Sequence, residues 1–191
     1  GDRSPSLPND MGFGQFYGLL YSNDQGRPVV WHDREIVEHH PIDQTTLTRR
    51  YTERAVAFVE ENRDRPFFLY LPHTFPHIPL HVGEDRLGTS AAGLYGDVVE
   101  ELDWSTGEVM DALDRAGVAQ NTLVVVSGDH GIPGFPRGKT NLYNLGTEVS
   151  LFVQWPGQAP GAHEVDDFIN LMDLAPTFLD AAGVSVPECM T

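Results

Sequence analysis

Apolar positions recur every three or four residues in two long segments of the chain. This spacing places them on one face of a helix, so each segment predicts an amphipathic helix with a buried stripe. The apolar stripes are Leu47, Tyr51, Ala55, Phe58 and Val59 in the first segment, and Leu94, Val98, Leu102, Val109 and Leu113 in the second.

Residues suited to helix ends stand where these patterns start and stop. Asp43 or Thr45 is placed to cap the first helix, and Gly117 offers a left-handed stop for the second. A third, shorter helix is predicted between a cap at Asp173 and a stop at Gly183.

Three short, continuous apolar runs predict strands that are covered on both faces. They span residues 67–71, 123–126 and 149–153, and Pro66 separates the first run from the preceding helix. Strands alternating with helices predict an α/β fold, with a mostly parallel sheet sandwiched by helices. Ligands of such sheets bind beyond the carboxyl ends of the strands.

The segment before the first helix has a different character. Residues 1–43 are rich in Gly, Pro, Asn and Asp but contain several aromatic residues, which predicts an irregular and partly buried loop region. Residues 44–191 are predicted to form the α/β core, and residues 1–191 are long enough for one domain or for a large part of a bigger one.

Composition narrows the range of partners. The formal net charge is −16, which disfavours nucleic acids and anionic membrane surfaces. No apolar run approaches the ~20 residues that a membrane-spanning helix needs. Cys189 is the only cysteine, so no intrachain disulfide can form and the compartment stays open.

Histidines and prolines are concentrated directly after the first predicted strand. His73, His77 and His81 lie within residues 72–81, where three prolines restrict the backbone. Imidazole can bind an anion, donate a proton near neutral pH or ligate a metal. His77 and His73 are the better candidates for substrate binding and His81 is more peripheral; the alternative is an ordinary surface loop.

Two further polar clusters follow the second predicted strand. Asp129 and His130 stand between glycines, where the carboxylate suits calcium or magnesium; the alternative is a helix cap beside a solvated histidine. Arg137 and Lys139 are cations on a glycine-containing loop, and they could hold sulfate or phosphate oxygens or simply be solvated. A metal, a cation and an acid at one sheet edge are suited to transfer of a tetrahedral oxyanion.

In these clusters and the segments around them, the chain resembles the sulfatase family of the alkaline-phosphatase-like fold, and arylsulfatase A-type members in particular. The matching blocks follow the family's order along nearly the whole chain. They are residues 12–24, 65–79, 95–105, 121–131 and 172–183.

The resemblance implies roles for individual residues. Asp129 and His130 match the family's second pair of calcium ligands, with magnesium or another divalent ion as the alternative. Lys139 matches the lysine that contacts the sulfate oxygens, and His77 matches the histidine near the leaving oxygen of the ester. Both are therefore expected to be catalytic and substrate-binding residues, and His73 is expected to bind substrate beside them.

The departures from the family pattern are equally specific. The nucleophile motif Cys-x-Pro-x-Arg, whose cysteine becomes formylglycine, is not in this chain, and neither is the early Asp-Asp metal pair. The chain is therefore interpreted as a fragment that is catalytically silent alone, with the formylglycine expected in a missing N-terminal part. Residues 139–147 resemble the sulfamidase branch instead.

The resemblance predicts a calcium-dependent hydrolase of small-molecule or carbohydrate sulfate esters, with no nucleic-acid partner. By the same resemblance, its compartment would be periplasmic, extracellular or lysosomal. Two alternatives stay open at this point. One is a phosphoric or phosphonic ester hydrolase of the same superfamily, because His130 also suits zinc. The other is an inactive, truncated product that only binds.

Overall fold

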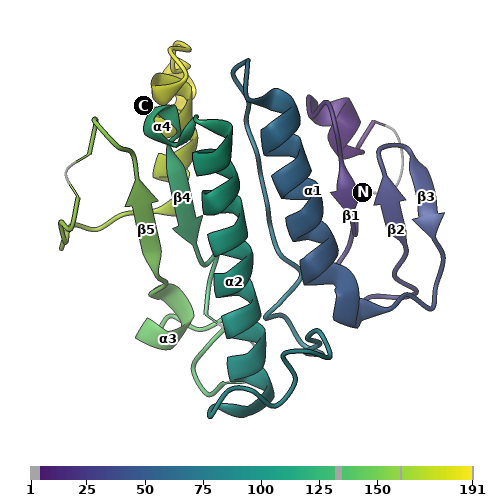
Figure 1. Cartoon of the computed structure of the whole chain (residues 1–191). Coiled ribbons are helices and arrows are strands. Elements are labelled where there is room, and N and C mark those ends of the chain that lie inside the picture. The colour runs from purple at the N-terminus through teal and green to yellow at the C-terminus, as the bar shows by residue number, and fades with distance from the viewer. Residues whose placement is uncertain (1–4, 132–134, 160, 191) are drawn as a thin grey trace. The chain divides into compact units, whose positions relative to one another are not determined.

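The computed structural model describes residues 5–131, 135–159 and 161–190. These residues form two compact units, of which the first ends at Val118 and the second begins at Ala119. Each unit is described by itself, and Figure 1 labels the helices and strands of both.

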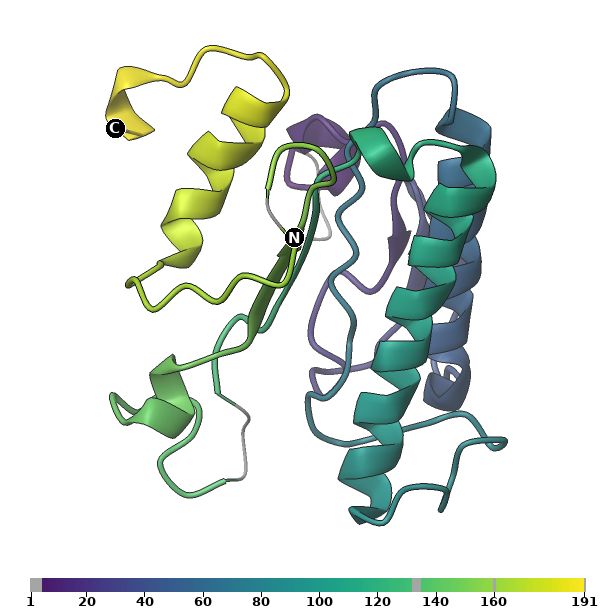
Figure 2. The ribbon, with the colours of Figure 1, turned by 60° about the vertical axis from the view of Figure 1, so that its left-hand side comes forward.

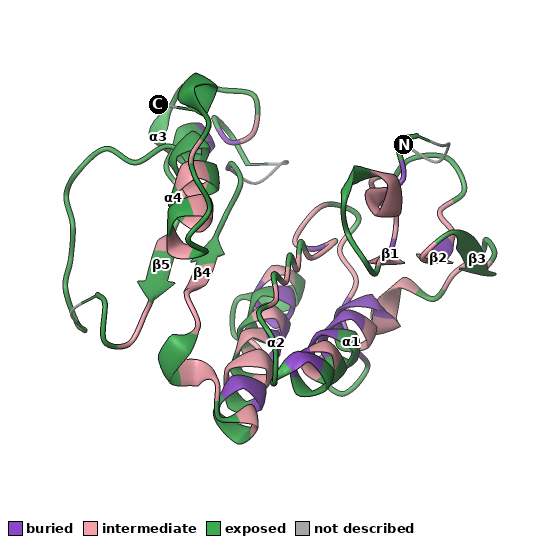
Figure 3. Cartoon of the chain, turned by 90° about the horizontal axis from the view of Figure 1, so that it is seen from above, coloured by how far each residue is buried: buried purple, intermediate pink, exposed green. Residues whose placement is uncertain are grey.

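Two long helices form the centre of the first unit. Helices α1 (Leu47–Asn62) and α2 (Gly93–Ala116) run side by side (Figure 2). Their facing sides hold the buried positions of both helices, as the colouring in Figure 3 shows. Between them, the Thr52 hydroxyl donates a hydrogen bond of 2.6 Å to Oγ of Ser105. Both predicted long helices are confirmed.

The predicted stop of the second helix is confirmed, whereas the predicted cap of the first lies one turn earlier than α1, whose own N-cap Thr46 makes no side-chain capping bond. The Asp43 carboxylate accepts a hydrogen bond from the Thr45 backbone N–H at 3.0 Å and caps the short 3₁₀ turn Gln44–Thr46, which leads into α1. Gly117 ends α2 with φ of 74°, a left-handed conformation that glycine adopts without steric cost.

A small antiparallel sheet precedes α1. Its strands β1 (Tyr17–Gly18), β2 (Val30–His32) and β3 (Glu35–Glu38) pair in the order β1-β2-β3. A 3₁₀ turn at Pro8–Met11 comes before them. Residues 1–43 are therefore not wholly irregular as predicted. The strands escaped notice because two to four residues are too short to show a two-residue alternation.

One hydrophobic core joins the small sheet, the two helices and the histidine loop. Its members come from every one of these segments, so the loop is held against the helices rather than projecting freely. The buried cluster consists of Val30, Leu47, Tyr51, Phe75, Val82 and Val98.

The predicted first strand is not a strand in this structure. Residues 67–71 form no ladder with any described strand. Phe67 nevertheless packs edge-on against Phe58 of α1, with ring centroids 5.8 Å apart, whereas Phe68 and Tyr70 are exposed. An apolar run shows only that a segment can be buried; it becomes a strand when a neighbour satisfies its backbone groups.

The second unit contains a two-stranded sheet and two helices. Strands β4 (Val124–Ser127) and β5 (Leu151–Gln154) pair antiparallel. Helices α3 (Asn144–Thr147) and α4 (Leu174–Ala181) complete the unit. Short 3₁₀ turns lie at Ala119–Asn121, Leu171–Asp173 and Glu188–Met190.

The expected strands and helix of this unit are present, but their pairing corrects one prediction. Every strand pair among the described residues is antiparallel, whereas a mostly parallel sheet was predicted. Strand direction depends on the route of the connecting chain, and hydrophobicity does not record that route. The third predicted helix is confirmed as α4, where Asn170 and Asp173 form a capping box and Gly183 follows with φ of 69°.

Within the described part of the chain, no helix is both long and apolar enough to cross a membrane.

Candidate functional site

Phe75 anchors the histidine loop in the first unit. Its side chain is only 3% exposed and belongs to the hydrophobic core. One residue earlier, the hydroxyls of Thr74 and of Tyr51 from α1 lie 3.1 Å apart in a hydrogen bond. Helix α1 thus holds the middle of the loop, between His73 and His77.

His77 lies two residues after Phe75 and is half-buried. Its Nδ1 atom donates a 2.7 Å hydrogen bond to the carbonyl oxygen of Ile78, which assigns the proton of the neutral ring to Nδ1. The Ser22 hydroxyl lies 3.4 Å from the same nitrogen. Nε2 is therefore the ring atom left for other partners, and it donates a hydrogen bond only when the ring is protonated.

Ser22 is held in place by its neighbour Asn23. The Asn23 side chain is 3% exposed, and its amide nitrogen donates to the Gln44 side chain at 3.0 Å and to the Pro79 carbonyl oxygen at 3.1 Å. These bonds tie the Ser22 turn to the far end of the histidine loop. Sequence analysis did not single out Ser22, although the hydroxyl lies inside one of the matching blocks.

His73 occupies a different environment from His77. Its Nε2 lies 3.2 Å from the Ser105 hydroxyl, which in turn accepts from Thr52, and its Nδ1 is shielded from water without a partner. Burial disfavours the charged ring and lowers its pKa from 6.5 to about 4. This packing favours a neutral, structural His73 over the substrate contact predicted from sequence.

Asp129 and His130 follow β4 in the second unit. His130 donates from Nδ1 to the Gly131 carbonyl oxygen at 2.9 Å, and its Nε2 lies 3.0 Å from Oδ2 of Asp129. The Asp129 side chain is 79% exposed, so the pair faces solvent. Neutral Nε2 and a carboxylate oxygen are both electron-pair donors. Their close approach needs a cation, either a proton or a metal ion.

Gly131 connects this pair with the loop that carries Lys139. Its backbone N–H donates to the Gly146 carbonyl oxygen at 3.1 Å. A side chain at Gly131 would collide with the Leu145 carbonyl, and one at Gly146 would collide with the carbonyls of Gly138 and Asn141. Two glycines thus allow the backbone of residues 138–146 to fold closely against the end of the Asp129-His130 segment.

Lys139 is the only lysine in the sequence, and it is half-buried on this loop. Arg137 stands two residues earlier, with its guanidinium carbon 4.7 Å from the centre of the Tyr143 ring. Arg137 and Thr140 both have positive φ, of 64° and 71°. The loop therefore carries two cations two residues apart in the sequence of a strongly acidic chain.

The donor atoms present fit part of a divalent metal site. Oδ2 of Asp129 and Nε2 of His130 are 3.0 Å apart, close enough for one ion to touch both at metal–ligand distances of about 2.0–2.6 Å. Among the residues described here, no group of three or more His, Cys, Asp or Glu side chains could hold an ion. The pair therefore offers two donor atoms, which are only part of the set that a divalent ion takes.

The structure brings the candidate residues together in two separate groups. His77 meets Ser22 in the first unit. Asp129 and His130 meet each other in the second unit, joined through Gly131 to the loop of Lys139. The convergence of His77, Asp129 and Lys139 around one ion and one oxyanion stays a prediction.

Comparison with known protein families gives a match over most of the chain. The model of the sulfatase family matches residues 3–184. Steryl-sulfatase of Rattus norvegicus is 35% identical over 190 residues, which cover 91% of this chain and 33% of that protein. N-acetylgalactosamine-6-sulfatase of Mus musculus is 30% identical over 217 residues, which cover 98% of this chain and 42% of that protein.

Solved structures show the same likeness in three dimensions. The crystal structure of Ps i-CgsB in complex with k-i-k-neocarrahexaose superposes with a TM-score of 0.83 at 25% identity, over 100% of this chain and 50% of that one. A putative sulfatase, yidJ from Bacteroides fragilis, gives a TM-score of 0.74 over 97% of this chain. This chain spans between about one third and one half of the proteins that it matches.

Proposed function

This chain belongs to the sulfatase family and shares its alkaline-phosphatase-like α/β fold, and from that premise we propose that the whole protein hydrolyses a sulfuric ester. The family match over residues 3–184 is the observation that carries the proposal. Water is consumed, the S–O bond to the alcohol is broken, and the products are the free alcohol and sulfate.

The nucleophile is proposed to lie outside this chain. The chain covers only 33% of rat steryl-sulfatase and has no Cys-x-Pro-x-Arg motif. A formylglycine in the missing part of the protein would supply a hydrated aldehyde oxygen as the nucleophile. The residues of this chain then have three tasks: to hold a cation, to hold the sulfate oxygens and to assist departure of the alcohol.

Asp129 and His130 are proposed to contribute to a calcium site. Their two donor atoms lie 3.0 Å apart and face solvent, which is compatible with a shared ion. When bound, the ion would offset the negative charge of the reacting group. Gly131 supports the proposal, because its bond to Gly146 holds this pair against the loop that carries the positive charge of Lys139.

His77 is proposed to give a proton to the leaving oxygen. Its Nδ1 atom is occupied by the Ile78 carbonyl and approached by Ser22, so Nε2 is the atom that faces a substrate. A protonated ring donates from Nε2 to the ester oxygen as the S–O bond breaks, and the alcohol leaves neutral. Lys139 is proposed to bind the sulfate oxygens as a point charge.

The test uses the full-length protein and an aryl sulfate. We expect sulfate release by the wild type, and loss of roughly 10²-fold or more in kcat/KM for Lys139→Ala, the loss expected from one oxyanion-binding group. Arg115→Ala, which removes an exposed cation from α2, is the matched control and is expected to leave kcat/KM unchanged. Equal activity of the two variants would contradict the role of Lys139.

Metal analysis of the same protein separates the proposal from its rival. We expect stoichiometric calcium, and activity that a chelator removes and added calcium restores. Stoichiometric zinc together with hydrolysis of phosphate esters would favour a phosphoric or phosphonic ester hydrolase, since imidazole suits zinc. A full-length protein without a nucleophile motif and without turnover would identify a protein that only binds.

A further inference from the structure

Asn23 is a buried polar residue in the segment between β1 and β2. Its side chain is 3% exposed, and it stands in a turn that the Gln25 backbone N–H closes by donating to the Ser22 carbonyl oxygen at 3.1 Å. Nδ2 of Asn23 donates to Oε1 of Gln44 at 3.0 Å and to the Pro79 carbonyl oxygen at 3.1 Å. A carbonyl oxygen only accepts, so the contact with Pro79 identifies which atom of the amide is the nitrogen.

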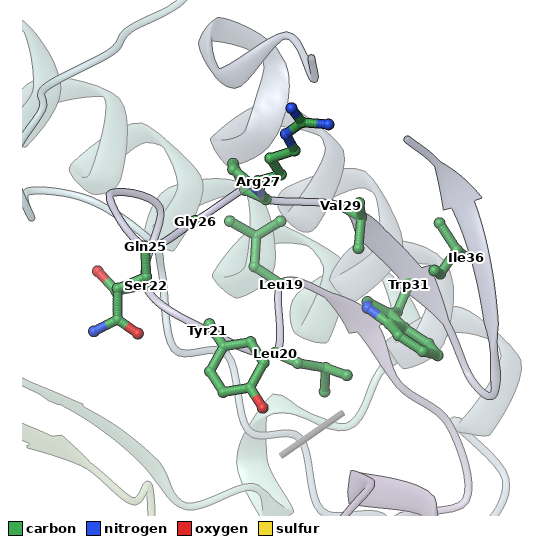
Figure 4. A pocket seen from close by; sticks show the side chains of 11 residues that line it. Leu19, Leu20, Tyr21, Ser22, Gln25, Gly26, Arg27, Val29, Trp31 and Ile36 are labelled. Carbon is green, nitrogen blue, oxygen red and sulfur yellow. The ribbon is translucent and has the colours of Figure 1, made fainter. Parts of the chain in front are cut away.

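The turn that carries Asn23 is not packed on every side. It borders a cavity of about 310 Å³, and Figure 4 shows Ser22 and Gln25 in the cavity wall. A segment beside a cavity lacks packed neighbours on that side, so its position depends on the contacts that it makes elsewhere. The two bonds from Nδ2 of Asn23 are contacts of this kind, and they hold the turn against the histidine loop.

The amide oxygen of Asn23 contributes no bond of its own. Across the described residues, Oδ1 is shielded from water and has no hydrogen-bond partner. Leaving a buried acceptor unpaired costs free energy. What asparagine contributes at this position is therefore the pair of bonds from Nδ2.

Pro79 links Asn23 to the imidazole of His77. The Ile78 carbonyl oxygen accepts the 2.7 Å hydrogen bond from Nδ1 of His77, and this carbonyl belongs to the peptide group that precedes the Pro79 ring. The ring of a proline restricts rotation about its N–Cα bond, so the directions of the Ile78 and Pro79 carbonyls are coupled. A hydrogen bond that holds the Pro79 carbonyl therefore restricts the Ile78 carbonyl as well.

The bond to the Ile78 carbonyl sets the orientation and the tautomer of the His77 ring. A carbonyl cannot donate, so the neutral ring keeps its proton on Nδ1, and Nε2 is left for the leaving oxygen. The Ser22 hydroxyl approaches the same nitrogen at 3.4 Å, which makes it the weaker of the two contacts. A displaced Ile78 carbonyl would free the ring to turn, and Nε2 would no longer point in one direction.

We propose that Asn23 is a positioning residue for the reaction and that it acts on His77 through the backbone of Ile78 and Pro79. Asn23 holds the carbonyl that engages Nδ1, and in this way it keeps Nε2 directed at the leaving oxygen. The inference rests on the proposed sulfatase function, in which His77 protonates the departing alcohol.

The experiment measures kcat/KM of the full-length protein for two aryl sulfates of similar shape. Nitrophenolate leaves 4-nitrophenyl sulfate without a proton, whereas the more basic phenolate of phenyl sulfate needs one. Asn23→Ala is expected to lower kcat/KM for phenyl sulfate roughly tenfold more than for 4-nitrophenyl sulfate, because a misdirected imidazole protonates the phenolate less effectively. Losses of the same size for both esters would overturn the inference.

Asn62→Ala is the matched control. Asn62 is also 3% exposed, and its Nδ2 donates to a backbone carbonyl, that of Phe58, at 2.7 Å, but it lies at the end of α1. This variant is expected to melt at a lower temperature than the wild type and to keep the wild-type ratio of the two kcat/KM values. If Asn62→Ala changed the ratio as much as Asn23→Ala, the effect would come from stability and the inference would be wrong.

A double-mutant cycle tests whether Asn23 acts through His77. In a His77→Ala background no imidazole remains to be positioned, so adding Asn23→Ala is expected to change kcat/KM for phenyl sulfate by less than about twofold, the usual error of additivity. A loss as large as in the wild-type background would contradict the positioning role.

Gln44→Ala provides a second variant if Asn23→Ala does not fold. It removes one acceptor of Nδ2 and leaves Asn23 in place. The expected result is again a larger loss for phenyl sulfate than for 4-nitrophenyl sulfate, and an unselective loss would count against the inference. A wild type that hydrolyses neither ester would instead overturn the proposed function on which the inference rests.

Discussion

The hydroxyl of Ser22 lies 3.4 Å from Nδ1 of His77, although 55 residues separate the two along the chain. Asn23 closes the same arrangement by donating to the Pro79 carbonyl at 3.1 Å. The segment between β1 and β2 therefore lies against the histidine loop. Because Nδ1 of His77 is bonded to the Ile78 carbonyl oxygen, Nε2 is the ring nitrogen left for other partners.

This geometry makes a prediction about leaving groups. His77→Ala is expected to lower kcat/KM for an alkyl or sugar sulfate by roughly 10²–10⁴-fold, because an alkoxide needs a proton to depart. The loss for 4-nitrophenyl sulfate is expected to be much smaller, since nitrophenolate leaves without one. Steady-state kinetics on both esters check this, with the exposed His39→Ala as control. Equal losses on the two esters would exclude proton transfer as the function of His77.

His73 makes stability depend on pH. Its pKa is lowered from 6.5 to about 4 by burial, so the unfolded chain takes up a proton at a higher pH than the folded one. The stability that neutral His73 contributes is fully present above pH 6.5 and is lost as the pH falls toward 4. The two pKa values limit this contribution to about 3 kcal/mol.

Melting temperatures of the full-length protein between pH 7.5 and pH 4 test this dependence. His73→Gln is expected to melt lower at pH 7.5, through loss of packing and of the Ser105 contact, and to lose less stability on acidification than the wild type. His39→Gln, which changes an exposed ring, is expected to follow the wild type. A parallel pH dependence in His73→Gln and wild type would contradict the assignment.

Gly131 is predicted to be intolerant of any side chain. A Cβ atom there would overlap the Leu145 carbonyl, so Gly131→Ala is expected to displace the loop that carries Lys139. A displacement of about 1 Å at a catalytic group costs roughly 10²-fold in rate, and kcat/KM is expected to fall accordingly. Gly161→Ala is the matched control, because a Cβ atom at Gly161 has no atom within 4 Å. Equal kcat/KM in both variants would disprove the close approach.

Two glycines of α2 are predicted to respond to alanine in opposite directions. Gly107 is exposed and a Cβ there contacts nothing within 4 Å, so Gly107→Ala is expected to stabilise the helix by about 0.5–1 kcal/mol. Gly96 is buried, and its Cβ would clash with Ser90 and Ala92, so Gly96→Ala is expected to lower the melting temperature. Thermal unfolding of both variants tests this prediction. Melting temperatures that shift in the same direction in the two variants would contradict it.

The sequence predicted the helical elements well because their cause is local. The apolar stripe from Leu47 to Val59 depends only on the spacing of side chains along the sequence. The stop at Gly117 depends on one left-handed backbone conformation, which a glycine in the sequence indicates. The candidate site residues were proposed for a similar reason. His77, Asp129 and Lys139 lie in motifs short enough to be recognised in the sequence, and their roles stay predictions.

The pairing of strands could not be predicted in the same way. The run at residues 67–71 has the apolar character of a strand, yet no described strand pairs with it. The pair β4 and β5 is antiparallel where a parallel arrangement was predicted. Hydrogen-bonded neighbours are chosen by the path of the whole chain, which a single segment does not record.

The sequence by itself determined the two long helices and the family of the chain, and it supplied the candidate site residues. Only the tertiary structure decided which imidazole is available: His77 has one ring nitrogen free, whereas His73 is buried against Ser105. The sequence alone does not show how the environments of these two histidines differ. They differ because burial and hydrogen bonding arise from residues distant in sequence, and those contacts decide whether a ring nitrogen can reach a substrate.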